Sequence, residues 1–156
     1  QQKGEKINRG TFELKLLIAE VVHSINALLQ KKAIGVKVNI GDKALVQADR
    51  EMVKIVLRNL VSNALKFSYE ASLISIDVRA GELMEVEIRD EGVGMSSEVL
   101  KNLFSMDMRS RPGTGNEEGS GLGLVLCKDF IEKNGGTLTV ESTEGKGSAF
   151  TFTIPI

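Results

Sequence analysis

The sequence predicts a single α+β domain in which a mixed or antiparallel β-sheet carries helices on one face. Segments with helical spacing of apolar residues and segments with strand-like alternation follow one another without the strict order of a parallel α/β protein. Short glycine turns, such as the one at Gly81, join some strand segments directly, which indicates antiparallel hairpins. The length of 156 residues fits one domain with its own hydrophobic core.

The first third of the chain predicts one long helix followed by two strands. Apolar residues recur every three or four positions from Thr11 to about Ala33, and Thr11 is a suitable N-cap for this helix. Residues 36–40 alternate between apolar and polar side chains, as a half-buried strand does. After a Gly-Asp turn, residues 44–48 predict a second short strand.

A second long helix is expected from Asp49, whose side chain can cap it, to about Phe67. Its apolar face consists of Met52, Val53, Val56, Leu57, Leu60, Val61, Ala64 and Leu65. Strands at 73–79 and 83–89 follow, and a short helix is expected at 96–104.

The last third of the chain predicts a long loop, a helix and a hairpin. Residues 105–119 show no periodicity and contain several charges and glycines, and ordered domains seldom keep such a long loop without a use. A helix follows the loop and ends at the Gly135–Gly136 pair. Strands at 137–141 and 148–154 complete the expected sheet.

Charge and composition argue against several classes of protein. The formal net charge of -1 gives no general attraction to nucleic acid or to an anionic membrane. No apolar run approaches the ~20 residues that a membrane-spanning helix needs. The single cysteine, Cys127, lies on the apolar side of the last helix, so a buried structural thiol is expected. We therefore expect a cytoplasmic protein without a nucleic-acid partner.

Three polar residues interrupt the second long helix. Asn59 and Asn63 stand four residues apart and share a face, and Lys66 follows about one turn later. Amide oxygens and an ammonium group suit a hydrated Mg²⁺ and its phosphates, because Mg²⁺ prefers oxygen ligands. The alternative is that an asparagine bonds to the neighbouring backbone and that the lysine is solvated.

Asp90 is a candidate for the recognition of a nucleotide base. It ends a strand and precedes Gly92 and Gly94. A carboxylate at this place can accept a hydrogen bond from an exocyclic amine, while the two glycines leave room for a flat base against the backbone. A simple Asp-Gly turn is the alternative.

The segment before the last helix is a candidate for phosphate binding. Gly119, Gly121 and Gly123 precede an apolar helical pattern, and the N–H groups at a helix start suit phosphate. Arg109 and Arg111 lie in the preceding loop and could contact a polyphosphate. The alternatives are a flexible turn at the glycines and solvated arginines in the loop.

Five segments in a fixed order resemble the sequence boxes of bacterial sensor histidine kinases. Asn59–Ser68 resembles their N box, and Asp90–Met95 resembles their first glycine box. Leu103–Phe104 resembles the F box, Gly119–Leu124 the second glycine box, and Gly145–Phe150 the third. The match covers nearly the whole chain, and the ordered set is far more specific than any single box.

The resemblance implies the ATP-binding catalytic domain of such a kinase, in the wider family shared with gyrase, mismatch-repair and chaperone ATPases. That fold is a two-layer α/β sandwich of the Bergerat type, with a mixed sheet of about five strands backed by three helices. Residues 11–156 would form the domain, with an ATP lid at 105–118. Residues 1–10 would be a linker from a dimerisation hairpin that the chain lacks, because His23 does not match a phospho-accepting histidine.

The resemblance also implies roles for single residues. Asn63 is expected to coordinate Mg²⁺, Asn59 to lie near the γ-phosphate or support the metal, and Lys66 to reach phosphate. These three residues form the implied catalytic set. Asp90 is expected to accept from the adenine amino group. The other residues expected at the nucleotide are Phe67, Gly92, Gly94, Met95, Phe104, Arg111, Gly119, Gly121, Leu122, Gly123, Leu124 and Ser148.

Asn59 carries an implication for mechanism. The hydrolysing members of the wider family place a glutamate there, and an amide cannot accept the proton of an attacking water. The resemblance thus implies a protein-histidine kinase that uses ATP and Mg²⁺ to phosphorylate a histidine on a separate dimerisation domain, with a response regulator as an indirect partner. The fragment is expected to be monomeric and its parent dimeric, either free or membrane-anchored.

Two other functions remain open from the sequence. One is a relative that phosphorylates serine on an anti-sigma partner, although the F box, the long loop and the glycine spacing at 119–124 argue against it. The other is a nucleotide-binding regulatory module without transfer activity, which the intact boxes make less attractive.

Overall fold

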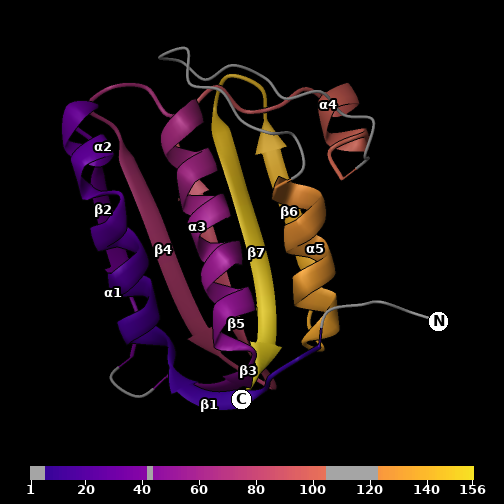
Figure 1. The fold of residues 1–156 in the computed structure, drawn as a ribbon. Coiled ribbons are helices and arrows are strands. Elements are labelled where there is room, and N and C mark those ends of the chain that lie inside the picture. The colour runs from indigo at the N-terminus through magenta and orange to yellow at the C-terminus, as the bar shows by residue number, and fades with distance from the viewer. Residues whose placement is uncertain (1–5, 42–43, 105–122) are drawn as a thin grey trace.

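The computed structural model describes residues 6–41, 44–104 and 123–156, which fold into two layers. One layer is a five-stranded sheet, and the other consists of the helices that cover one of its faces (Figure 1). The strands of the sheet are, in spatial order, β2 (Gly35–Asn39), β4 (Leu73–Ala80), β5 (Leu83–Asp90), β7 (Gly147–Pro155) and β6 (Leu138–Thr143). Because β2 and β4 pair in parallel while the other neighbours pair antiparallel, the sheet is mixed. The predicted α+β sandwich is confirmed.

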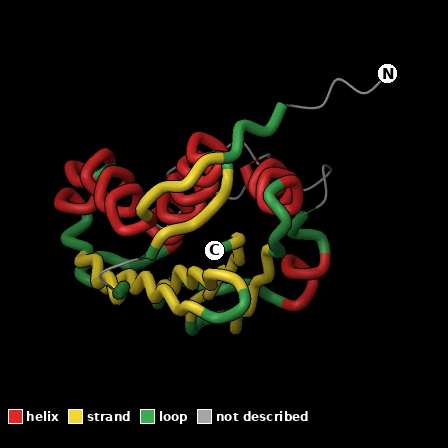
Figure 2. The backbone as a smooth tube through the Cα atoms, turned by 90° about the horizontal axis from the view of Figure 1, so that it is seen from below, coloured by secondary structure: helices red, strands yellow, loops and turns green. Residues whose placement is uncertain are grey.

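Three helices cover the sheet, as predicted. Helices α1 (Leu14–Ser24), α3 (Arg50–Phe67) and α5 (Gly123–Lys133) lie side by side on one face (Figure 1). Helix α2 (Asn26–Lys31) continues from α1, and the short helix α4 (Ser97–Lys101) lies beyond the upper end of α5 in that view. Figure 2 shows the same two layers from below, with the helices on one side and the sheet on the other.

Helix α3 lies at the centre of the core. The Asp49 side chain caps it by accepting hydrogen bonds from the backbone N–H groups of Glu51 and Met52, at 3.1 and 3.2 Å. All eight residues of its predicted apolar face are buried. The predicted cap, limits and buried face of this helix are therefore confirmed.

The prediction of one helix capped by Thr11 was wrong. Residues Gly10–Glu13 form strand β1, which pairs antiparallel with β3 (Leu45–Ala48) in a separate two-stranded sheet, visible in Figure 2. The helix starts only at Leu14, and Ile25 separates α1 from α2. Thr11 and Phe12 favour extended backbone, and β3 offers them a partner that local periodicity could not reveal.

The segment before β1 contacts the domain where the structure describes it. The Asn8 N–H donates to Asp49 Oδ2 at 2.9 Å, and Arg9 donates to the carbonyl oxygen of Lys133 at 3.1 Å. Asn134, which is fully buried, accepts from the Asp49 N–H at 2.7 Å and so joins the end of α5 to the start of α3. A linking role for residues 1–10 stays a prediction.

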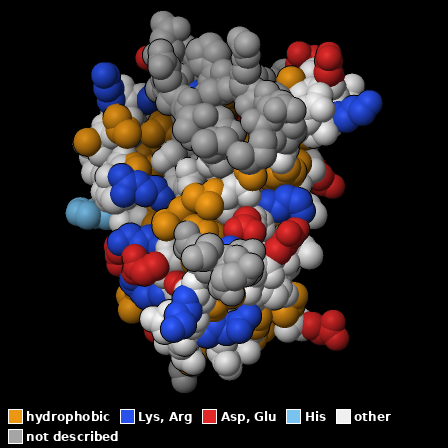
Figure 3. Space-filling model, turned by 45° about the vertical axis from the view of Figure 1, so that its right-hand side comes forward, with side chains coloured by type: hydrophobic (Ala, Val, Ile, Leu, Met, Phe, Trp, Pro, Cys, Tyr) orange, Lys and Arg blue, Asp and Glu red, His pale blue; other side chains and the backbone are white. Residues whose placement is uncertain are grey.

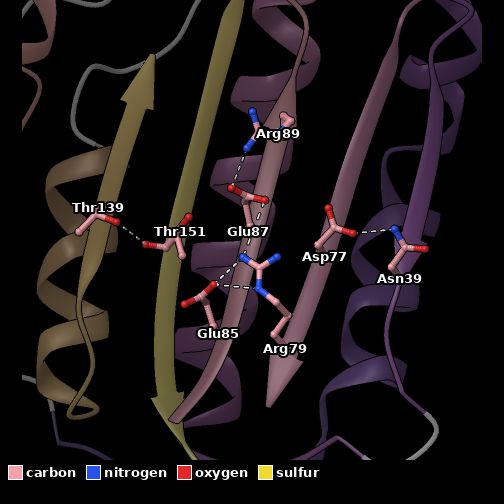
Figure 4. A network of polar contacts seen from close by, with 8 residues as sticks. All are labelled: Asn39, Asp77, Arg79, Glu85, Glu87, Arg89, Thr139 and Thr151. Carbon is pink, nitrogen blue, oxygen red and sulfur yellow. Dashed lines mark hydrogen bonds and ion pairs between the residues drawn. The ribbon is translucent and has the colours of Figure 1, made fainter. Parts of the chain in front are cut away.

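The face of the sheet opposite the helices is polar. Arg79 on β4 pairs with Glu85 on β5 at 2.5 Å, and Arg89 pairs with Glu87 at 3.0 Å (Figure 4). Asn39 on β2 donates to Asp77 on β4 at 2.6 Å. Opposite charges within a strand and between neighbouring strands stabilise each other while the side chains remain in contact with water. This face of the sheet therefore needs no second layer of helices.

Candidate nucleotide-binding site

The second half of helix α3 carries the polar residues that the sequence singled out. The Asn59 amide donates from Nδ2 to the carbonyl oxygen of Ile55 at 3.0 Å, so one half of the expected alternative, a bond to the neighbouring backbone, does occur. Asn63 lies one turn later, is half-buried, and makes no side-chain hydrogen bond within the described part of the chain. Its amide therefore remains available to a ligand.

Lys66 and Phe67 end helix α3. Lys66 is buried, which rules out the alternative of a solvated lysine, and its Nζ lies 5.0 Å from the centroid of the Phe67 ring. An ammonium over an aromatic face is attracted by the ring quadrupole. The last turn of α3 thus presents a cation and a half-buried aromatic ring side by side.

Asp90 ends strand β5 next to this turn. Its side chain is buried and accepts a hydrogen bond from the Gly92 N–H at 2.9 Å. Burial raises the pKa of the Asp90 carboxyl, while the backbone N–H groups of Gly92 and Ser148 act in the opposite direction. The two oxygens of a carboxylate can together accept more hydrogen bonds than these two N–H groups supply, so the Asp90 carboxylate is suited to bind an amino group of a base.

Gly92 and Gly94 allow the backbone segments of the site to approach one another closely. A Cβ on Gly92 would lie 2.0 Å from the carbonyl oxygen of Phe67, and one on Gly94 would lie 2.1 Å from that of Thr143. Gly94 also has a φ of 67°, which favours glycine. These contacts with the protein's own backbone account for both glycines without a bound base, so their expected contact with adenine stays a prediction.

Ser148 lies directly opposite Asp90 in the β5–β7 register. Its hydroxyl oxygen is 2.8 Å from the hydroxyl oxygen of Ser142, which in turn donates to the carbonyl oxygen of Gly147 at 2.9 Å. Since the single hydroxyl proton of Ser142 is then used, Ser148 is the donor in their pair. Ser142 also accepts from the buried Met95 N–H at 2.8 Å. It therefore joins strand β6 to the start of β7 and to the segment after Asp90.

Sequence reasoning missed Ser142. It lies at the next-to-last position of strand β6, opposite Ser148 in the β6–β7 register. The only available signal was the pairing of two serines across the short Gly145–Gly147 turn, which requires the hairpin register to be known.

The start of helix α5 faces the amide of Asn59. A Cβ on Gly123 would lie 2.9 Å from Asn59 Oδ1, so the absence of a side chain lets the two helices approach. Leu124 and Phe104 are partly buried and pack on the hydrophobic core. Cys127 is fully buried, as expected, and burial raises the pKa of its thiol to about 12, while a hydrogen bond with Asn59 opposes that shift.

Four predicted site residues lie outside the described residues. They are Arg111, Gly119, Gly121 and Leu122. The expected lid at 105–118 lies outside them as well. The described residues nevertheless bring together the end of α3, the end of β5, the start of β7 and the start of α5.

The donor set fits Mg²⁺ held jointly with a nucleotide better than an all-protein metal cage. Within residues 6–41, 44–104 and 123–156, no group of three His, Cys, Asp or Glu side chains could hold a metal ion. Mg²⁺ is commonly bound through one or two protein oxygens together with substrate phosphates and water. The unbonded Asn63 amide could supply such an oxygen.

Comparison with known proteins identifies the family. Residues 48–156 match the family described as histidine kinase-, DNA gyrase B-, and HSP90-like ATPase. The chain is 35% identical to the sensor protein EvgS of Escherichia coli O157:H7, over 97% of this chain and 14% of EvgS. It is also 35% identical to the adaptive-response sensory kinase SasA of Prochlorococcus marinus, over 90% of this chain and 38% of SasA.

Solved structures of histidine kinases are similar to this chain as well. The catalytic domain of histidine kinase ThkA superposes with a TM-score of 0.83 at 29% identity, over 95% of this chain and 97% of that domain. ThkA in complex with the response regulator protein TrrA gives a TM-score of 0.78 at 28% identity, over 98% of this chain and 43% of that one. No helix in the described residues combines the length and apolar character needed to cross a membrane.

The comparisons and the geometry agree on one domain type. The chain spans only 14% and 38% of the two sensor proteins, but nearly all of the ThkA catalytic domain. The family match includes α3, Asp90 and the β6–β7 hairpin, which together form the described part of the site. The chain therefore belongs to the histidine kinase-, DNA gyrase B- and HSP90-like ATPases, as the ATP-binding catalytic domain of a sensor histidine kinase.

Proposed function

We propose that this domain binds ATP together with Mg²⁺ and transfers the γ-phosphate to a histidine on a separate dimerisation domain of the same kinase. The observation that carries the proposal is the buried Asp90 carboxylate, which lies beside the Lys66–Phe67 turn and opposite Ser148. A site with one buried anion for a base and one cation for phosphate is complementary to the two ends of a nucleotide.

Each residue has a proposed part in binding. Asp90 accepts from the adenine amino group, and Phe67 flanks the base. Lys66 neutralises phosphate charge, which stabilises the transfer transition state. Asn63 supplies a protein oxygen ligand to Mg²⁺. The bound ion would neutralise part of the negative charge on the phosphates.

Asn59 distinguishes transfer from hydrolysis. Its amide is already fixed by the Ile55 carbonyl and by the approach of Gly123. An amide has no basic site that could take a proton from water, so ATP is held for a better nucleophile. We infer slow hydrolysis and efficient transfer once an acceptor histidine is present.

The proposed partners follow from the relatives. A structure of ThkA with a response regulator supports a response regulator as the indirect partner of the parent kinase. We propose that the parent is a dimer, that this fragment is monomeric, and that the domain works in the cytoplasm, where ATP is available. Acidic and basic side chains are interspersed on the described part of the face in Figure 3, which does not favour nucleic-acid binding.

The proposal is tested by adding a separately purified dimerisation hairpin from a sensor kinase, with its histidine intact, to this domain and γ-labelled ATP. We expect label on the hairpin, and none when the hairpin histidine is replaced by glutamine or when Asn63→Ala is used. ATP binding without transfer to hairpins from several related kinases would favour a regulatory module.

A further inference from the structure

The last turn of helix α3 is held by a lysine from outside that helix. Lys32 follows α2, and its side chain is buried with 8% of its surface exposed. Its Nζ donates to the carbonyl oxygens of Leu65 and Lys66, at 2.9 and 3.1 Å. These are backbone groups of the turn that carries Lys66 and Phe67.

With this lysine, every carbonyl at the end of α3 has a donor. A helix leaves its last four carbonyl oxygens without partners inside the helix. Here the hydroxyl of Ser68 donates to the first of them, on Ala64, at 2.6 Å, and Lys32 donates to the next two. The N–H of Val93 donates to the fourth, on Phe67, at 3.1 Å.

The ammonium group is suited to this place. A cation near the carboxyl end of a helix interacts favourably with the helix dipole, and hydrogen bonds from a charged donor are stronger than neutral ones. Burying an ammonium is costly unless it is well bonded. A buried lysine spent on two backbone carbonyls therefore fixes the position of this turn strongly.

The backbone of Lys32 holds the following loop as well. Its carbonyl oxygen accepts from the Ala71 N–H at 3.1 Å. Ala33 and Ala71 have φ values of 57° and 62°, a left-handed conformation that is unfavourable for alanine. Together with the two bonds from its Nζ, the bond from Ala71 makes Lys32 a direct link between the end of α2, the end of α3 and the loop after α3.

We propose that Lys32 is a positioning residue for ATP binding: by bonding to the Leu65 and Lys66 carbonyls it holds the Lys66 ammonium toward the phosphates. This inference rests on the proposed function. The effect should be larger for Lys66 than for Phe67. The Phe67 carbonyl is held independently of Lys32, by the Val93 N–H and by its close contact with Gly92. Loss of the Lys32 ammonium should therefore affect phosphate binding more than base binding.

The test compares Lys32→Met with Lys31→Met by calorimetric titration with ATP and with adenosine. Lys31 is the exposed preceding residue, so its variant removes an equal charge without touching α3. We expect Lys32→Met to weaken ATP binding by roughly tenfold or more and adenosine binding by much less. Lys31→Met should leave both affinities close to those of the wild type.

Equal ATP affinities of folded Lys32→Met and Lys31→Met would overturn the inference while leaving ATP binding itself intact. An equal loss for ATP and adenosine would also overturn it, since the lysine would then support the fold in general. If Lys32→Met does not fold, Lys32→Leu, which also has no donor, replaces it, and a wild-type ratio of the ATP and adenosine affinities in that variant contradicts the proposal. Failure of the wild type to bind ATP would instead overturn the proposed function, and this inference with it.

Discussion

Gly92 and Phe67 touch through their backbones: a Cβ on Gly92 would lie 2.0 Å from the carbonyl oxygen of Phe67. This contact joins the loop after Asp90 to the end of α3, and the neighbouring Val93 N–H donates to the same oxygen. Because backbone atoms form both sides, neither side can move without disturbing a secondary-structure element. The distance between the proposed base-binding and phosphate-binding groups depends on it.

Gly92→Ala is therefore expected to destabilise the domain. The added methyl group must displace backbone, and overpacking of this kind costs at least about 2 kcal/mol of unfolding free energy. Gly81→Ala is the matched control, because its Cβ would meet only the Leu83 carbonyl at 3.6 Å, an ordinary contact. Urea unfolding of both variants measures the difference. Equal stability of the two would show that the contact is not tight in solution.

Asp90→Asn is expected to remove most of the ATP affinity. Hydrogen bonds to charged groups contribute about 1.5–3 kcal/mol, so the loss should be roughly 10- to 100-fold. Asp77→Asn, on the polar face of the sheet, is the control and should bind ATP normally. Unchanged ATP affinity in the Asp90 variant would reject the adenine assignment.

The same carboxyl predicts the pH dependence of binding. Burial raises the pKa of Asp90 above its usual 3.8, so it becomes protonated at a higher pH than an exposed aspartate. The proposed bond needs the ionised form, and ATP affinity should therefore weaken as the pH falls toward that raised pKa. Titrations of adenosine across this range isolate the effect from phosphate ionisation. A flat adenosine profile would contradict it.

Asn63→Ala should weaken ATP binding more in the presence of Mg²⁺ than with EDTA, because the variant lacks the proposed protein ligand to the metal. Ser62→Ala, at the neighbouring half-buried position, serves as the control. Calorimetry under both conditions gives the two ratios. A loss of the same size with EDTA would mean that Asn63 does not act through the metal.

Glu20 predicts an acid-sensitive contribution to stability. Hydrogen bonds from Lys54 and Arg50 lower its pKa to about 2. A lowered pKa contributes stability above the unfolded value of 4.5, and this contribution is lost as the pH falls from there toward 2. Glu20→Gln should therefore flatten the dependence of the unfolding free energy on pH in this window. The change should be small, because the ion pairs of Glu20 with Lys54 and Arg50 are exposed to solvent. The exposed Glu82→Gln should keep the wild-type profile.

Local signals predicted the elements that depend on local chemistry. The Asp49 cap and the apolar stripe of α3 are encoded within a few residues, and both are confirmed. The short helix expected at 96–104 also forms, with Ser96 accepting from the Val99 N–H as its cap, although it ends at Lys101 and not at Phe104. The ordered boxes fixed the family, because their order along the chain is itself a rare pattern.

Features that depend on distant pairing could not be predicted in this way. Thr11 lies in a strand because β3 pairs with it, and periodicity in the neighbouring helix concealed that. Lys32 lies 33 residues before the first carbonyl that it holds, and in sequence it resembles any lysine at a helix end. The contact of Ser142 with Ser148 likewise required the register of the last hairpin.

The most direct test of the central claim is a calorimetric titration of the purified domain with ATP, with and without Mg²⁺. We expect a dissociation constant in the range of about 1 μM to 1 mM, with tighter binding in the presence of Mg²⁺. Absence of binding under both conditions would contradict it and would indicate a domain that has kept the fold of the family without its nucleotide site.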